Sequence, residues 1–166
     1  MAVTAYFQPT FQLNHLRWSS AARTASPYAV DLSDVATVNL KVGLIATGTL
    51  NATRSTTAAY EFVADLLANS GSALTEEAGT NYARQVLASV TWTRAALVDT
   101  LTCANPSWTT ATISSKYAFF YAEGGGTDAT RPLIAIWDFG GTVSVVAGTY
   151  TLQIAGTGLV TWTAAV

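Results

Sequence analysis

The sequence predicts an all-β fold, mainly antiparallel, that forms a β-sandwich or barrel with one short helix and an extended N-terminal arm. The main observation is that large apolar residues alternate with small or polar ones in residues 116–123, 132–139 and 149–154. Successive side chains of a strand face opposite sides, so each run places one face on a core. Glycines separate the runs, and glycine readily adopts the positive φ of tight turns. We expect the three runs, closed by residues 159–163, to form an antiparallel meander.

The glycine-rich breaks define where we expect the chain to reverse. They lie at residues 124–126, 140–141, 148 and 156–158. Between the breaks, the alternation puts Leu133, Ala135, Trp137 and Phe139 on one side of a strand, with Ile134, Ile136 and Asp138 on the other. Trp137 and Tyr150 occupy inward positions in this pattern, so both side chains should be largely buried.

The composition fits one folded domain with a weakly charged surface. The chain has 166 residues, of which 50% are hydrophobic, and this is enough for the core of a single domain. Only 11% of the residues are charged, whereas ordinary soluble domains have about 25%. The net charge is −2 and the pI is about 5.1, which disfavours a nucleic-acid partner, because broad phosphate contact needs clustered Lys and Arg. The surface must therefore be rich in Thr, Ser, Ala and Gly, or covered by partners.

Residues 1–36 differ from the rest of the chain and form the predicted N-terminal arm, which leaves residues 37–166 as the β-sandwich domain. The arm combines aromatic residues with Pro9 and Pro27 and has no sustained period. Proline biases the chain to extended geometry, and the fully extended arm would reach on the order of 100 Å. We expect the arm to bind partners through its apolar side chains, or alternatively to fold back along one edge of its own sandwich. The expected partner-binding residues are Tyr6, Phe7, Phe11, Leu13 and Trp18.

The middle of the chain supplies three further strands and the helix. Residues 37–47 alternate apolar and polar side chains and form the first predicted strand of the domain. Residues 57–68 change to helical spacing, with an apolar stripe typical of a helix that packs on a core. Residues 85–93 return to alternation, with β-branched residues towards their end, and residues 97–104 alternate as well, which predicts two more strands.

The sequence favours a protein that is not an enzyme, and we expect no catalytic residue, no metal site and no cofactor. His15 is the only histidine, and it lies in the arm, where an ordered catalytic or zinc-binding pocket is unusual. Cys103 is the only cysteine, so an internal disulfide is impossible, and its apolar neighbours predict a buried core thiol. The adjacent acids Glu76 and Glu77 cannot face each other on one element, so we expect solvated or capping roles for them.

The sequence shows neither a secretory signal nor a membrane span. Its first residues lack a basic start followed by a continuous apolar core. The most apolar region, residues 133–166, is interrupted by Gly and Thr and alternates instead. We expect a protein that is made in the cytosol, keeps its first residues and has no membrane partner.

From residue 41 onwards, the chain resembles a group of small structural proteins of tailed bacteriophages. The resemblance lies in the order of the strands and the positions of the turns, and it includes no catalytic motif. The segments that carry it are KVGLI at 41–45, YAFFY at 117–121, PLIAIWDFGG at 132–141, VVAGTYTLQI at 145–154 and GLVTW at 158–162. The arm falls outside the resemblance.

The resemblance implies a virion component, and the first expectation is a capsid decoration (cement) protein on the capsid surface, made in the host bacterial cytoplasm. Its implied partners are the major capsid protein and neighbouring copies of itself, as a homo-oligomer on the virion. A tail or neck component is the alternative within the same class. A glycan-binding β-sandwich is an alternative from another class, with Trp108, Tyr117 or Trp137 as exposed stacking platforms.

Overall fold

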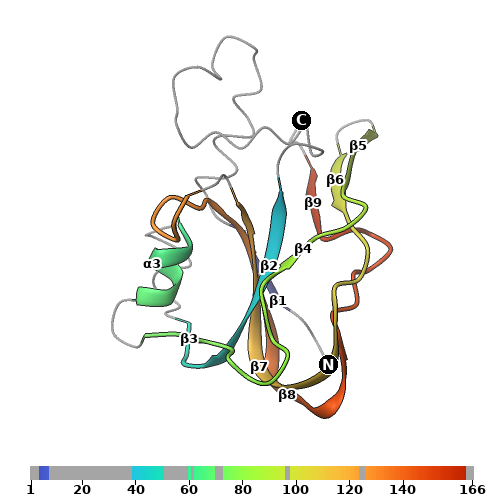
Figure 1. The fold of residues 1–166 in the computed structure, drawn as a ribbon. Helices are drawn as coiled ribbons and strands as arrows, with labels where there is room; N and C mark the ends of the chain where they lie inside the picture. The colour runs from blue at the N-terminus through green and yellow to red at the C-terminus, as the bar shows by residue number, and fades with distance from the viewer. Residues whose placement is uncertain are drawn as a thin grey trace.

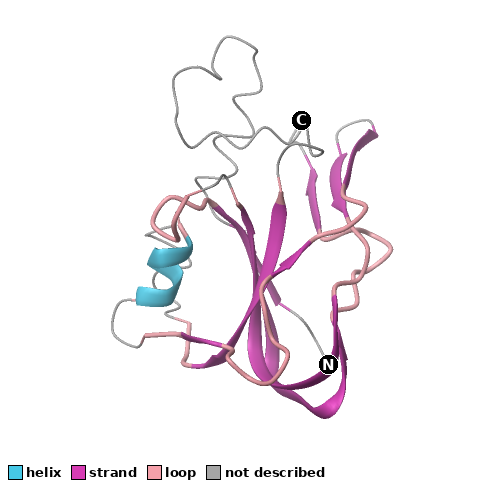
Figure 2. Cartoon of the chain, in the orientation of Figure 1, coloured by secondary structure: helices cyan, strands magenta, loops and turns pink. Residues whose placement is uncertain are grey.

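The computed structural model describes residues 4–7, 39–50, 60, 62–69, 73–95, 98–123 and 126–163. Strands dominate it, and the described part contains one short helix (Figures 1 and 2). In chain order the elements are β1 (Thr4–Phe7), β2 (Leu40–Thr47), α3 (Val63–Ala68), β3 (Thr75–Glu76), β4 (Gln85–Val86), β5 (Thr91–Ala95), β6 (Val98–Thr102), β7 (Ser107–Ala122), β8 (Leu133–Thr151) and β9 (Val160–Thr163). The strands expected at 37–47 and 97–104 and the helix expected at 57–68 are therefore present with shorter bounds. The single strand expected at 85–93 is replaced by two short strands, β4 in the large sheet and β5 in the small one.

The strands form two antiparallel sheets. The large sheet has the order β1-β8-β7-β2-β3, with β4 also paired to β2, and the small sheet has the order β5-β6-β9. Leu101 of β6 and Val160 of β9 share an apolar cluster with Phe120 of β7, so the two sheets pack face to face. Helix α3 lies to the other side of the large sheet (Figure 1). The structure confirms a mainly antiparallel β-sandwich with one short helix, and it excludes the alternative of a closed barrel.

Strands β7 and β8 form a long hairpin of the large sheet whose far end bends towards the small sheet (Figure 1). β8 runs without reversal through residues 140–141 and 148, so the expectation of turns at these two glycine breaks was wrong. Gly140 does adopt a positive φ of 71°, but the register shifts along the hairpin bend the strands instead of reversing them. Strands that bend at bulges can pass from one layer to the other. The far end of the hairpin, where Trp108 pairs with Tyr150, accordingly packs into the core between the layers.

The predicted meander is therefore only partly correct. The break at 124–126 does separate β7 from β8, and these two strands pair antiparallel. Residues 160–163 instead form β9, which pairs with β6 in the small sheet. The reason is the bend of the hairpin. The far end of β8 lies near the small sheet, so the chain that follows it can add a strand there.

A bulge near the start of β8 changes the predicted faces of two residues. The β7–β8 register shifts between Phe120 and Tyr121. As a result Leu133 joins the apolar cluster beneath α3, and Ile134 joins the cluster between the sheets, the reverse of simple alternation. From residue 135 onwards the predicted alternation holds.

The large sheet has an apolar cluster on each face. The cluster between the two sheets includes Leu40, Val42, Leu44, Leu101, Phe120 and Val160. The cluster beneath α3 includes Ile45, Val63, Leu66, Phe119 and Ile136. Because both faces are covered, the run 117–122 is apolar at every position, as expected for a strand buried on two sides.

The structure confirms that Trp137 and Tyr150 are buried, with 8% and 5% of their surfaces exposed. The ring of Trp137 meets Phe120 edge-on, with centroids 5.0 Å apart. Cys103 is less buried than predicted, because β6 ends at Thr102 and Cys103 begins the connection to β7 at the margin of the core. Burial still raises the pKa of the Cys103 thiol to about 11, so it stays protonated at neutral pH.

Candidate functional site: the outer edge of β8

The outer edge of β8 is covered by another strand over only part of its length. β1 pairs antiparallel with β8 from Thr4 opposite Asp138 to Phe7 opposite Ala135. Farther along, residues 142–151 pair with β7 on one side, and none of the described strands lies on the other side. An edge of this kind presents backbone N–H and C=O groups with which another strand can pair.

A pocket of about 380 Å³ opens beside this edge. Because β8 bends, its two halves line the pocket together, with Trp137 and Phe139 from the first half and Tyr150 from the second. The other lining residues are Val143, Ser144, Val145, Thr149, Thr151, Leu152 and Gln153. The lining is therefore aromatic and aliphatic, with hydroxyl and amide groups as its polar side chains. Such a pocket favours an apolar group and disfavours a charged one.

The phenol of Tyr150 is held in place and does not act as an acid or a base. Its hydroxyl lies 2.7 Å from the Ser115 hydroxyl, and its ring meets Trp108 edge-on with centroids 5.9 Å apart. Burial raises the pKa of Tyr150, so the hydroxyl stays protonated at neutral pH. The pocket thus offers shape and apolar contact without a group that titrates near neutrality.

The chain around this edge carries no charge. No Asp, Glu, Lys, Arg or His occurs between Asp138 and the last residue, Val166. Val146 lies in the free part of β8 with 80% of its surface exposed, more than Val86, the other exposed large apolar residue in the described part of the chain, at 55%. Natural sheets usually protect a free edge with charged side chains or proline. An edge without them is suited to contact with another molecule.

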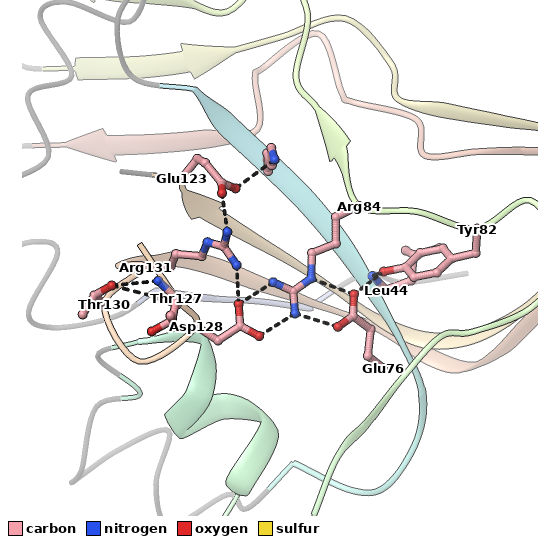
Figure 3. A network of polar contacts seen from close by, with 10 residues as sticks. Leu44, Glu76, Tyr82, Arg84, Glu123, Thr127, Asp128, Thr130 and Arg131 are labelled. Atoms are coloured by element: carbon pink, nitrogen blue, oxygen red, sulfur yellow. Dashed lines mark hydrogen bonds and ion pairs between the residues drawn. The ribbon is translucent and has the colours of Figure 1, made fainter. Parts of the chain in front are cut away.

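Six charged residues gather on the side of the large sheet that carries α3, and Arg84 is at their centre. Its Nε and Nη2 donate hydrogen bonds to Glu76 at 2.7 and 2.6 Å, and its Nη1 and Nη2 donate to Asp128 at 2.6 and 2.8 Å. Figure 3 shows the guanidinium between the two carboxylates. It also lies 5.2 and 5.3 Å from the ring centroids of Phe119 and Tyr121. Paired charge-assisted bonds and aromatic contacts of this kind fix Arg84 firmly.

The ion pairs continue from Asp128 back to the sheet. Arg131 bonds Asp128 at 2.9 Å and also bonds Glu123 (Figure 3). The ammonium of Lys41 in β2 lies 2.9 Å from Glu123. We call these residues, Lys41, Glu76, Arg84, Glu123, Asp128 and Arg131, the ion-pair cluster. It ties the loop after β7 and the segment before β4 to the same face of the sheet.

The ion-pair cluster holds no free acid or base. Bonds from Arg84 lower the pKa of Asp128, although partial burial opposes them. Burial would raise the pKa of Glu123, but its Lys and Arg partners outweigh that effect and lower it. Both acids therefore stay ionised and paired at neutral pH, and the cluster acts as a structural clamp.

Tyr82 joins the cluster to β2. Its hydroxyl donates to Glu76 at 2.8 Å and accepts a hydrogen bond from the Leu44 N–H at 2.8 Å. The pKa of Tyr82 is raised, mainly by burial, so the hydroxyl remains a donor. The ring of Tyr82 also stacks on Trp108, with centroids 6.2 Å apart.

The ion-pair cluster could not be predicted from the sequence, because its members are spread from residue 41 to residue 131 without a local motif. Only the pairing of β2 with β7, and the return of two loops over one face, brings them together. The scarcity of charged residues was the only available signal, and it names no partners.

The two adjacent acids have different roles. Glu77 has the capping role that we expected: its Oε1 accepts from the Ala78 and Gly79 N–H groups at 2.9 and 2.7 Å, and its Oε2 accepts from the Ser114 N–H at 2.7 Å. Glu76 is not a cap: it pairs with Arg84, and 25% of its side-chain surface is exposed.

The predicted attachment residues lie only partly within the described structure. Tyr6 and Phe7 belong to β1, opposite Ile136 and Ala135 of β8. Phe11, Leu13 and Trp18 lie outside the described residues, as does His15. Two of the five predicted residues are thus at the same sheet edge as the pocket.

The structure contradicts the expected stacking platforms of a glycan-binding site. Trp108, Tyr117 and Trp137 are exposed by only 2%, 4% and 8%. They are buried because the large sheet is covered on both faces and the bent hairpin turns its far end into the core. None of the three offers a ring to a sugar at the surface.

Comparison with known proteins assigns no family. No protein-family model matches the chain, and neither the curated proteins nor the solved structures include a significant match. Within the described ranges, no three or more His, Cys, Asp and Glu side chains are grouped so that they could hold a metal ion. The described helix is too short to span a membrane. The surfaces of the fold therefore carry the functional argument.

Proposed function

We propose that this protein is a structural component of a tailed-bacteriophage virion, most directly a capsid decoration protein that binds the lattice of the major capsid protein. The observation that carries the proposal is the uneven distribution of charge. The ion-pair cluster lies on one side of the large sheet, and its charges neutralise one another. The outer edge of β8 has no charge and opens onto an apolar pocket. Surfaces that stay buried in an assembly are more apolar than ordinary protein surface, so this distribution fits a protein that works through contact.

The small sheet adds a second surface on which hydroxyl groups predominate. Thr93, Thr100 and Thr161 occupy one row across β5, β6 and β9. In the next row the Thr91 and Thr102 hydroxyls lie 2.7 Å apart. Hydroxyls that bond to each other lose little when a partner covers them, whereas a charged surface would lose its hydration. This surface supports an assembly role.

The N-terminal arm has one part that pairs with its own domain and a second part that carries further apolar residues. β1 pairs with the edge of β8 in its own chain, so residues 4–7 follow the alternative of an arm that folds back along its own sandwich. We infer that the remaining apolar residues of the arm, Phe11, Leu13 and Trp18, contact the capsid. Buried aromatic side chains contribute most to the affinity of an interface, and the arm is rich in them.

Immunogold labelling of purified virions that contain this chain tests the proposed function. We expect label over the head at many positions per particle. Label confined to the tail or neck would favour the alternative of a tail or neck component. Absence of the chain from the mass spectrum of purified virions would refute both.

A binding assay with undecorated capsids tests the attachment residues separately. We expect the variant Phe11→Ala/Leu13→Ala/Trp18→Ala to lose occupancy on the capsid. Val86→Ala, which removes an exposed apolar side chain from β4, is the matched control and should bind like the wild type. Full occupancy by the triple variant would show that another surface holds the protein.

A further inference from the structure

The free part of β8 differs from the other edges of the described sheets. The edge strands β1, β3, β4, β5 and β9 have four, two, two, five and four residues, and short strands offer little template for pairing. β3 and β5 also contain the charged residues Glu76 and Arg94. Residues 142–151 of β8 are longer than any of these strands and contain no charge.

The regular part of this edge is residues 142–146, because Ala147 has a positive φ of 48° and interrupts the strand geometry. Alternate side chains in this segment have different surroundings. The exposed residues are Thr142, Ser144 and Val146, and the half-buried residues are Val143 and Val145. The two half-buried valines also line the pocket, so any strand placed beside them would lie next to the pocket.

We propose that residues 142–146 pair antiparallel with the same residues of a second copy, about a twofold axis through Ser144. In this register Val143 of each copy lies opposite Val145 of the other, so the two surfaces are self-complementary. Opposed side chains of antiparallel strands have Cβ atoms about 4.5–5.5 Å apart, close enough for the valines to pack together. The pairing joins two large sheets into one and places each copy next to the pocket of the other.

A second copy fits this edge better than a charged partner. Pairing two uncharged segments removes no ionised group from water, whereas a Lys, Arg, Asp or Glu placed at the apolar pocket would lose its hydration. The contact involves few residues, so the dimer is weak in solution. Where an assembly raises the local concentration, a larger fraction of the chains is paired. The pairing is tested on the purified chain alone. It can therefore fail while the proposed virion role holds, and the virion role can fail while the pairing holds.

Sedimentation equilibrium of the full chain, from about 5 µM to about 1 mM, tests the pairing in a range where weak contacts are detected. We expect a reversible monomer–dimer equilibrium. Ser144→Lys places two like charges at the axis and should weaken the dimer at least tenfold. Val86→Lys makes the same charge change at an exposed site on β4 and should leave the dimer unchanged. Equal melting temperatures show that both variants are folded.

A cysteine variant tests the register. Ser144→Cys in a Cys103→Ser background places two thiols across the axis, where the spacing of paired strands suits a disulfide. We expect it to form a covalent dimer much faster than Thr93→Cys in the same background, since Thr93 is exposed on the small sheet. Equal rates would reject the proposed axis. A wild-type chain that stays monomeric throughout, or a dimer that Ser144→Lys does not weaken, would overturn the proposal.

Discussion

The ring of Phe119 lies against Gly43 on the neighbouring strand. The two residues are opposite each other in the β2–β7 register, and a Cβ on residue 43 would stand only 2.2 Å from Cζ of the ring. The same ring supports Arg84, whose guanidinium carbon is 5.2 Å from the ring centroid. The glycine thus gives the ring the space in which it can support the ion-pair cluster.

Gly43→Ala should therefore destabilise the fold. Phe119 is fully buried, and three of its ring atoms lie within 3.0 Å of the added methyl group, so the neighbours must move. Overpacking of this kind typically lowers the free energy of unfolding by about 1–3 kcal/mol, which urea unfolding would measure. Gly141→Ala is the matched control, because no atom lies within 4 Å of its added Cβ. An unchanged unfolding midpoint for Gly43→Ala would contradict the close contact.

Arg84→Met should destabilise the fold more strongly, because it leaves the carboxylates of Glu76 and Asp128 facing each other without their shared cation. Removing one partner of a buried ion pair costs about 3–5 kcal/mol, and the partial exposure of Arg84 reduces our expectation to about 2–4 kcal/mol. Arg84→Lys should lose less, since it keeps the charge but cannot bond both carboxylates in pairs.

Lys116→Met controls for the loss of a single cation. Lys116 makes one 3.3 Å bond to the Gly48 carbonyl, so its removal should cost less than about 1 kcal/mol. Similar losses for the Lys116 and Arg84 variants would show that the cluster does not clamp the loops.

The same cluster predicts how stability depends on pH. Its cations lower the pKa of Asp128 and Glu123 in the folded chain below the unfolded values of about 4. The folded state therefore binds fewer protons than the unfolded state. The contribution of the ion pairs to the free energy of unfolding is complete at pH values above these unfolded pKa values. It is lost as the pH falls through the lower folded values, so the free energy of unfolding should decrease from about pH 5 downwards.

Urea unfolding at a series of pH values would measure this dependence. In Arg84→Met the acid-induced loss should be smaller, because Asp128 no longer has its main partner. An identical pH profile for the variant and the wild type would show that the Arg84 bonds do not set the ionisation of Asp128.

The features of the fold that depend on local interactions could be predicted from the sequence, and those that depend on contacts between distant segments could not. Alternation is local, so the strand near residue 40 and the inward positions of Trp137 and Tyr150 could be predicted from sequence. A glycine pair, however, does not distinguish a reversal from a bend, and at Gly140 the partner strand decides between them. The partners of Arg84 depend on the register of the sheet and on two loops, and no spacing in the sequence encodes these. The free edge of β8 was equally hidden, since it required knowing where the strand bends.

Trp137→Ala tests the part of the core that also forms the pocket. Trp137 is 8% exposed, packs edge-on against Phe120 and lines the pocket beside β8. Truncation of a buried aromatic usually costs about 3–5 kcal/mol, and we expect the lower part of this range, because water can enter the enlarged pocket from the open edge. Trp137→Phe keeps an aromatic ring against Phe120 and should lose less. Unfolding midpoints of both variants in urea give the comparison, and a Trp137→Ala protein as stable as the wild type would show that this ring does not join the two layers.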